Sequence, residues 1–101
     1  MAQASGNEVS GTFSGTGRSD WLVMTAGDVE INFGTATVTV DVSTDNGSTW
    51  ITLKLPDMST AASFTADTYM LLGPFPRATA VSVNCSAYTS STTYKIRKTN
   101  G

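Results

Sequence analysis

Apolar and polar residues alternate with a period of two along most of the chain, which is the pattern of half-buried β-strands. The clearest stretch is 35–43, where three valines at every second position face one way and polar residues, among them Asp41, face the other. A weaker alternation over 9–17, interrupted by glycines, fits either an edge strand or the continuation of a polar arm formed by 1–8. Further strands are expected at 20–24, 29–33, 50–55, 69–72, 79–88 and 92–98.

Turn-forming residues separate these stretches. The Asp-Asn-Gly sequence at 45–47 is a hairpin signal between two alternating runs. The Gly-Pro-Phe-Pro sequence at 73–76 cannot lie inside a central strand ladder. Residues 57–67 form a polar connection with room for one helical turn. We therefore expect two antiparallel hairpins, one within 38–55 and one within 81–97.

These elements define the expected fold. About seven short strands with frequent turns predict an all-β, single-domain antiparallel β-sandwich, with an open barrel as the alternative. The sandwich is expected over 18–101, and an extended N-terminal arm over 1–17. A chain of 101 residues has the length of one domain and can bury a core of its own.

Composition narrows the classes of function. Charged residues make up 14% of the chain, below the usual quarter, and Ser and Thr supply most of the polar surface. The net charge of −2 gives no basic footprint, so we expect no nucleic-acid partner. No apolar run approaches the ~20 residues of a membrane span, and we expect no membrane partner. The first residues lack the charged and apolar regions of a signal peptide. We therefore expect a protein that is made in the cytoplasm and carries no export signal.

Few side chains are suited to catalysis or metal binding. The sequence has no histidine, and its single cysteine, Cys85, lies on the apolar phase of a strand, where a buried thiol is expected. Asp41 and Asp45 with Asn46 are the best candidates for calcium, but their spacing is not that of an EF-hand loop, and solvated turn residues are the better interpretation. We predict no catalytic residues, no metal and no cofactor, and therefore no enzyme activity.

The most specific local motif is the S-x-D-x-G-x-T-W sequence at 43–50, which is similar to the Asp box that recurs in sialidases and related propellers. Ser43, Asp45, Gly47 and Trp50 are its defining residues. The Asp side chain can cap backbone N–H groups, Gly supplies a positive φ, and Trp can fold back onto the hairpin. We interpret the motif as a structural hairpin, with sugar binding as the weaker alternative.

Two groups of side chains are candidates for an interface. Phe75 between two prolines, and also Phe13 and Trp21, either anchor a neighbouring subunit or cap the protein's own core. Lys95, Arg97 and Lys98 form a basic patch. This patch either protects an edge strand or docks onto an acidic surface.

Two blocks, at 37–50 and 83–97, together resemble a group of small β-rich proteins of tailed bacteriophages. In that group a strand leads into a D-x-G-x-x-W hairpin, and a C-x-A-Y-x-S segment follows near the C-terminus. The blocks keep this order and separation within 20–98. The chain departs from the group at Ser91, where Gly is usual, and at Lys95, where Arg is usual.

The resemblance implies a virion-associated protein made in the host cytoplasm. Our first hypothesis is a non-enzymatic structural protein of the virion, specifically a capsid decoration (cement) protein. Its expected partners are the major capsid protein and further copies of itself, with a trimer suggested by analogy. The alternatives are a tail, fibre or neck component, and a carbohydrate-binding module that stacks sugars on Trp21, Trp50 or Tyr88.

Overall fold

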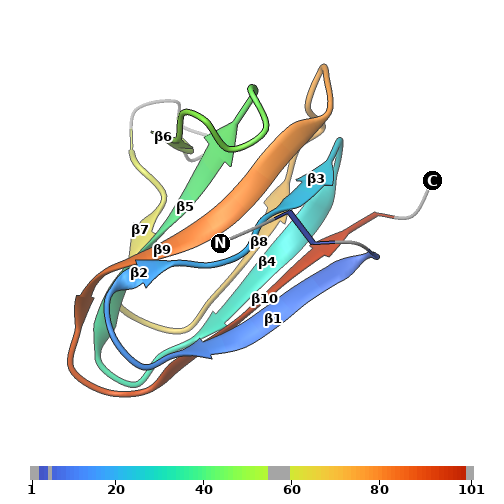
Figure 1. Cartoon of the computed structure of the whole chain (residues 1–101). Coiled ribbons are helices and arrows are strands. Elements are labelled where there is room, and N and C mark those ends of the chain that lie inside the picture. The colour runs from blue at the N-terminus through green and yellow to red at the C-terminus, as the bar shows by residue number, and fades with distance from the viewer. Residues whose placement is uncertain (1–2, 5, 55–59, 100–101) are drawn as a thin grey trace.

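The computed structural model describes residues 3–4, 6–54 and 60–99, which form two antiparallel sheets packed face to face, with no helix among them (Figure 1). The predicted all-β sandwich is confirmed. The strands are β1 (Glu8–Phe13), β2 (Gly17–Arg18), β3 (Leu22–Met24), β4 (Gly27–Asn32), β5 (Ala36–Ser43), β6 (Ile51–Thr52), β7 (Ser63–Phe64), β8 (Thr68–Leu72), β9 (Thr79–Tyr88) and β10 (Thr92–Lys98).

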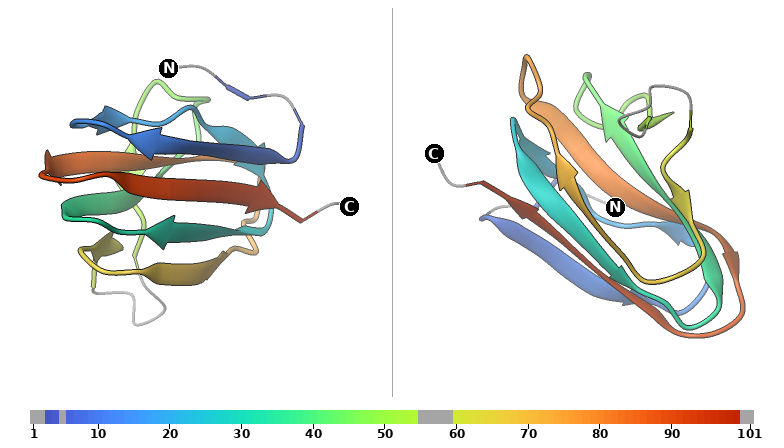
Figure 2. Two further views of the ribbon diagram at one scale, coloured as in Figure 1. Left: turned by 90° about the horizontal axis from the view of Figure 1, so that it is seen from below. Right: turned by 180° about the vertical axis from the view of Figure 1, so that it is seen from behind.

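The first sheet has the strand order β1-β10-β4-β8, with β1 and β8 at its opposite edges (Figure 2). Ile96 on β10 lies opposite Val9 on β1 and Val29 on β4, so one row of the ladder is apolar throughout. All three side chains are buried. The alternate positions of the same strands face away from the core and carry most of the sheet's charged residues.

The second sheet is built on the pairing of β5 with β9, which continues past an irregularity between Thr37 and Val38. Short strands extend it on both sides. β2 and β3 pair with successive parts of β9, and β6 and β7 with successive parts of β5. Because every outer strand here has only two or three residues, β5 and β9 carry the sheet.

The core lies between the two sheets and is made mostly of valines and other aliphatic side chains at every second strand position. β9 is unusual because both of its faces are covered. Val81 and Val83 point into the core, while Ala80 and Ser82, on the opposite phase, are also buried. The outer face of the second sheet therefore has a covering layer of its own, which contains the candidate site described below.

The expected arm over 1–17 is wrong for its C-terminal part. Residues Glu8–Phe13 form strand β1, which pairs with β10 along its whole length, so the edge-strand alternative holds there. Val9 and Phe13 are buried in the core because they occupy the inward phase of this strand. The described residues before it are Gln3, Ala4, Gly6 and Asn7, of which Gln3 and Ala4 run beside Trp21.

The expected hairpin within 81–97 is also wrong. β9 belongs to the second sheet and β10 to the first, so the connection between them crosses the sandwich. The connection between β4 and β5 crosses at the same end, and the two crossings are joined: the amides of Thr89 and Ser90 both donate to the carbonyl of Thr35. The amide of Thr35 in turn donates to Ser90 Oγ over 2.6 Å.

The strand expected at 50–55 is shorter than predicted. The ladder with β5 contains only Ile51–Thr52, and the amide of Leu53 adds one further bond, to the carbonyl of Val40. Leu55 lies outside the described residues. The polar connection that follows contains strand β7 rather than a helical turn in its described part, 60–67.

Candidate functional site

The Asp-box turn has the local geometry that its sequence predicts. Ser43 Oγ donates to Asp45 Oδ1 over 2.6 Å and accepts from the amide of Gly47 over 2.9 Å. Asp45 Oδ1 also accepts from the amide of Thr49 over 2.9 Å. Gly47 has a φ of 94°, in the region that favours glycine. The motif therefore closes the turn by bonds between residues of the motif itself.

The tryptophans are arranged differently from the expectation that Trp50 would cover the turn. Trp21 covers it instead: a Cβ added at Gly47 would lie 2.7 Å from the Trp21 ring, and the indole Nε1 donates to Asn46 Oδ1 over 3.3 Å. Trp50 packs edge-on against Trp21, with ring centroids 5.6 Å apart. The sequence did not predict this contact, since Trp21 lies just before β3 and Trp50 just before β6, far away in the chain.

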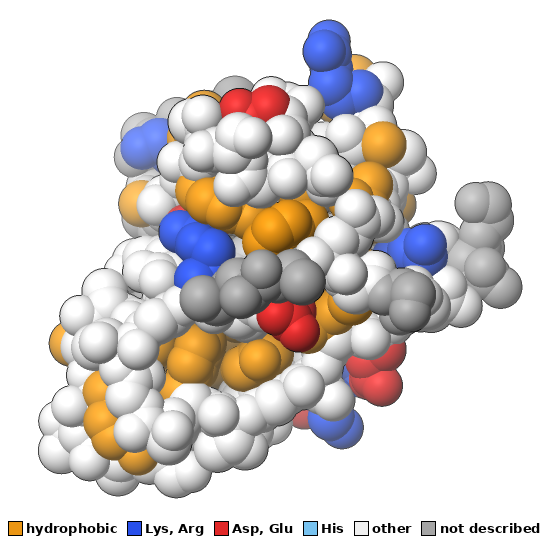
Figure 3. Space-filling view, in the orientation of Figure 1, with side chains coloured by type: hydrophobic (Ala, Val, Ile, Leu, Met, Phe, Trp, Pro, Cys, Tyr) orange, Lys and Arg blue, Asp and Glu red, His pale blue; other side chains and the backbone are white. Residues whose placement is uncertain are grey.

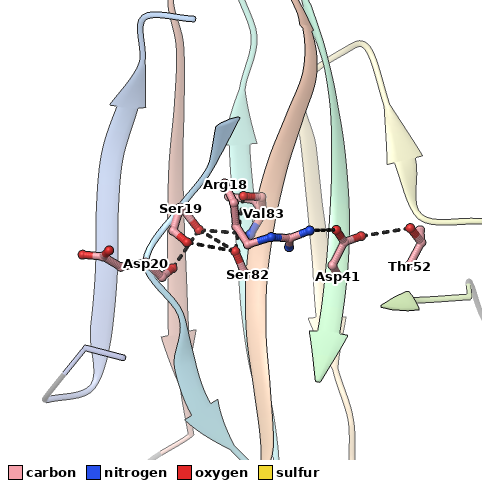
Figure 4. A network of polar contacts seen from close by, with 7 residues as sticks. All are labelled: Arg18, Ser19, Asp20, Asp41, Thr52, Ser82 and Val83. Atoms are coloured by element: carbon pink, nitrogen blue, oxygen red, sulfur yellow. Dashed lines mark hydrogen bonds and ion pairs between the residues drawn. The ribbon is translucent and has the colours of Figure 1, made fainter. Parts of the chain in front are cut away.

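On the outer face of the second sheet, Arg18 and Asp41 form an ion pair (Figure 4), and Arg18 also contacts Trp50. Arg18 Nη2 and Asp41 Oδ2 are 2.8 Å apart, and the Asp41 side chain is only 6% exposed. Asp41 Oδ1 also accepts from the hydroxyl of Thr52 over 3.0 Å. The Arg18 guanidinium lies 4.5 Å above the ring of Trp50. We call Arg18, Trp21, Asp41, Asn46 and Trp50 the tryptophan cluster.

Two buried serines fix the chain next to this cluster (Figure 4). Ser19 Oγ lies 3.1 Å from Ser82 Oγ and accepts from the amide of Val83 over 3.1 Å. The Ser82 hydroxyl also lies 3.0 Å from the carbonyl oxygen of Ser19. These contacts hold the segment between β2 and β3 against β9, and so they position Arg18 for its ion pair with Asp41.

The candidate calcium ligands are already in use. Asp41 is bound by Arg18, and the carboxylate of Asp45 is bound by Ser43 and Thr49. No group of three or more acidic, Cys or His side chains suited to a metal ion occurs among the described residues. The hydroxyl of Ser43 and the amide of Thr49 hold the pKa of Asp45 below its ordinary value of 3.8.

The candidate interface side chains do not form one surface. Phe13 is buried and packs against Tyr94, with centroids 4.9 Å apart, and Phe75 packs against the core. The apolar phase of β1 directs the Phe13 ring into the core, so the alternative of capping its own core holds for Phe13, and Phe75 is half-buried after β8. For Phe75, the alternative of capping its own core holds.

The basic patch is also divided. Arg97 is bound by Asp28 over 2.9 Å and by Glu30 over 3.1 Å, and these hydrogen bonds and charges raise its pKa. Lys95 is exposed on the same outer face, and Lys98 is half-buried. A basic patch of three free charges is therefore not present, because the neighbouring strand β4 supplies carboxylates that the sequence pattern did not place beside Arg97.

Sequence reasoning missed the most exposed apolar side chains of β8. Tyr69 is 58% and Leu71 is 72% exposed on the outer face of the first sheet. Met70 and Leu72 point inward on the alternate phase. Since nearly all positions of this strand are apolar, alternation could not indicate which phase faces the core.

Cys85 is buried, as predicted, and burial raises the pKa of its thiol.

No protein-family model, curated protein or solved structure matches the chain. In the region that the structure describes, no helix is long and apolar enough to cross a membrane.

Replacing Asp45 with Asn should weaken the acid dependence of stability. Because the pKa of Asp45 is lowered in the folded protein, its ionised form adds stability above the ordinary value of 3.8, and this is lost as the pH falls through the folded-state pKa. Thermal unfolding of the variant should therefore differ from the wild type at neutral pH and converge with it in acid. The control Glu8→Gln removes one exposed carboxylate outside the turn. If Glu8→Gln changed the pH dependence of stability as much as Asp45→Asn does, the interpretation would be contradicted.

Trp50→Ala should lower the free energy of unfolding by about 2 kcal/mol, less than a fully buried aromatic because Trp50 is half-buried. The loss comes from its contacts with Trp21 and Arg18. Chemical denaturation measures it, with Ile51→Ala as a matched neighbour that is already 66% exposed. Equal effects of the two substitutions would show that Trp50 contributes no packing.

Proposed function

We propose that the chain is a non-enzymatic structural protein of a bacteriophage virion, specifically a capsid decoration (cement) protein. The observation that carries the proposal is the location of the two blocks that resemble phage proteins. The first block, 37–50, runs along β5 into the Asp-box turn. The second, 83–97, runs along β9, across the sandwich and into β10.

These blocks coincide with the framework of the fold. β5 and β9 are the central pair of the second sheet, and β10 is an inner strand of the first. The features that the chain shares with the phage group are therefore the strands that support two broad outer surfaces. We propose that the chain acts through those surfaces, and charged side chains are few and scattered on the face seen in Figure 3.

The N-terminal residues are suited to attachment. Gln3 pairs with Trp21 in parallel, and the amide of Ala4 donates to the carbonyl of Trp21 over 2.7 Å. Gly6, with a φ of 89°, forms the corner between this segment and β1. We propose that this segment at the edge of the second sheet exchanges its bonds to Trp21 for contacts with the major capsid protein. Many such weak contacts on one particle add up to stable attachment.

Deletion of residues 1–6 tests this attachment. The truncated protein should keep its fold, since β1 begins at Glu8, but should bind less tightly to phage heads that lack their own copy. A sedimentation assay with purified heads measures the binding, and circular dichroism checks the fold. Undiminished binding would remove the N-terminal segment from the proposal without touching the rest.

Co-purification separates the head from the tail. A decoration protein should accompany full heads and also the heads of tailless mutants. A tail, fibre or neck component should be missing from tailless particles.

Sugar binding is disfavoured by the packing of Trp21 on Gly47 and of Arg18 on Trp50, which covers one ring face of each tryptophan.

A further inference from the structure

Strand β8 is an edge strand of the first sheet. In the described part of the chain it pairs with β4 on one side and with no strand on the other. Its five residues, Thr68–Leu72, contain no charged residue and no proline. Natural edge strands usually carry charge, proline or a bulge, or are kept very short, to prevent pairing with another chain. Every edge strand of the second sheet has only two or three residues.

The exposed side chains of this edge are uncharged and mostly apolar, and the Tyr69 hydroxyl donates to Asp28 Oδ2 on β4 over 3.0 Å. Tyr69 and Leu71 stand on the outer face of the sheet at 58% and 72% exposure. The charged side chains next to them, Asp28 opposite Leu71 and Glu30 opposite Tyr69, are both bound to Arg97. The edge therefore presents an uncharged strip, and behind it the two carboxylates of β4 share one guanidinium, that of Arg97.

We propose that β8 pairs with β8 of a second copy of this chain, in antiparallel orientation and centred on Met70. In a continuous sheet, residues directly opposite each other share a face, so Tyr69 must face a residue of the same phase. The register centred on Met70 places Tyr69 of each copy opposite Leu71 of the other. It also pairs all five residues of both strands, whereas a shift by two residues leaves some of them unpaired.

Symmetry and charge both favour a second copy as the occupant. A two-fold contact requires a surface that complements itself, and this strand meets that condition in a single register. Two uncharged strands meet at the axis, and the carboxylates of Asp28 and Glu30 stay one strand behind it on each side. No like charges are brought directly opposite each other, which is the arrangement that destabilises cross-strand pairs.

The resulting assembly joins two four-stranded sheets into one continuous sheet. A contact five residues long is small beside the about 1,200 Å² that stable complexes bury, so the dimer should be reversible and depend on concentration. This two-fold unit replaces the trimer suggested by analogy. The inference rests on β8 alone and does not depend on the virion assignment.

Analytical ultracentrifugation of the Leu71→Lys variant tests the proposal. In the proposed register the lysine of each copy lies opposite Tyr69 of the other copy, and this replaces an apolar contact with a charge. The wild type should reach twice the chain mass as concentration rises, and the variant should stay at the mass of one chain. Ile51→Lys is the matched control, because Ile51 is equally apolar and 66% exposed but lies on β6. It should dimerise like the wild type.

A wild type that stays monomeric, a trimer, or equal loss of dimer in both lysine variants would overturn the proposal. Should Leu71→Lys fail to fold, amide hydrogen exchange of the wild type replaces it. Exchange within 68–72 should slow as concentration rises, by the fraction of chains in dimers. Exchange independent of concentration in this strand would equally overturn the proposal.

Discussion

Asp41→Asn should lower the free energy of unfolding by about 3 kcal/mol, the lower end of the range for breaking a buried ion pair. Its carboxylate forms an ion pair with Arg18 over 2.8 Å and accepts a hydrogen bond from the Thr52 hydroxyl over 3.0 Å. Nη1 of Arg18 is already buried without a hydrogen-bond partner in the described region. Loss of the carboxylate's charge would leave a guanidinium that is 21% exposed, stacked on Trp50 and without its ion pair.

Chemical denaturation measures this effect, and Asp28→Asn is the matched control. Asp28 is also bound to an arginine, but its side chain is 25% exposed and Arg97 keeps Glu30 as a second partner. The control should therefore lose much less stability. Similar losses for the two variants would show that the Asp41 pair is no more than a surface contact.

Gly27→Ala should lower the free energy of unfolding by about 3 kcal/mol through a backbone clash, at the upper end of the usual range for overpacking. Gly27 lies on β4 directly opposite Lys98 of β10. An added Cβ would overlap the carbonyl oxygen of Arg97 and lie 2.9 Å from the Cα of Lys98. Both atoms belong to the backbone, so β4 and β10 would have to separate at this end.

The control is Gly15→Ala, at a loop position where an added Cβ meets nothing within 4 Å. That substitution should leave stability unchanged or raise it slightly, because alanine restricts the unfolded chain. Thermal and chemical unfolding of both variants measure the difference. A Gly27→Ala protein as stable as the wild type would mean that the two strands are not as close as the structure places them.

Local sequence signals predicted what depends on neighbouring residues. The alternation at 35–43 located β5 to within one residue, because its inward phase is buried in the core. The Asp-box turn was predictable because Ser43, Asp45 and Gly47 bond to one another within the motif. Burial of Cys85 followed from its place on the inward phase of β9.

Features that depend on distant residues were not predictable. β9 and β10 look like a hairpin in sequence, but the bonds from Thr89 and Ser90 to Thr35 belong to a crossing between sheets. Strand β1 was obscured by Gly11, whose lack of a side chain is explained only by the Tyr94 ring that lies over it. No local pattern reports such a contact.

The same limit applies to the candidate site. Residue type does not reveal exposure, so Phe13 was expected at an interface and Tyr69 was overlooked. The contact between Trp21 and Trp50 joins segments that are far apart in sequence. The ion pair of Arg18 with Asp41 depends on how β2 lies across β9, which is a property of the folded sheet.

Quantitative binding to phage heads that lack their own copy tests the central proposal most directly, with stoichiometry determined from the mass of the decorated particles. The decoration role predicts saturable binding in a fixed ratio to the major capsid protein. The absence of binding, or saturation at only a few copies per head, would contradict it.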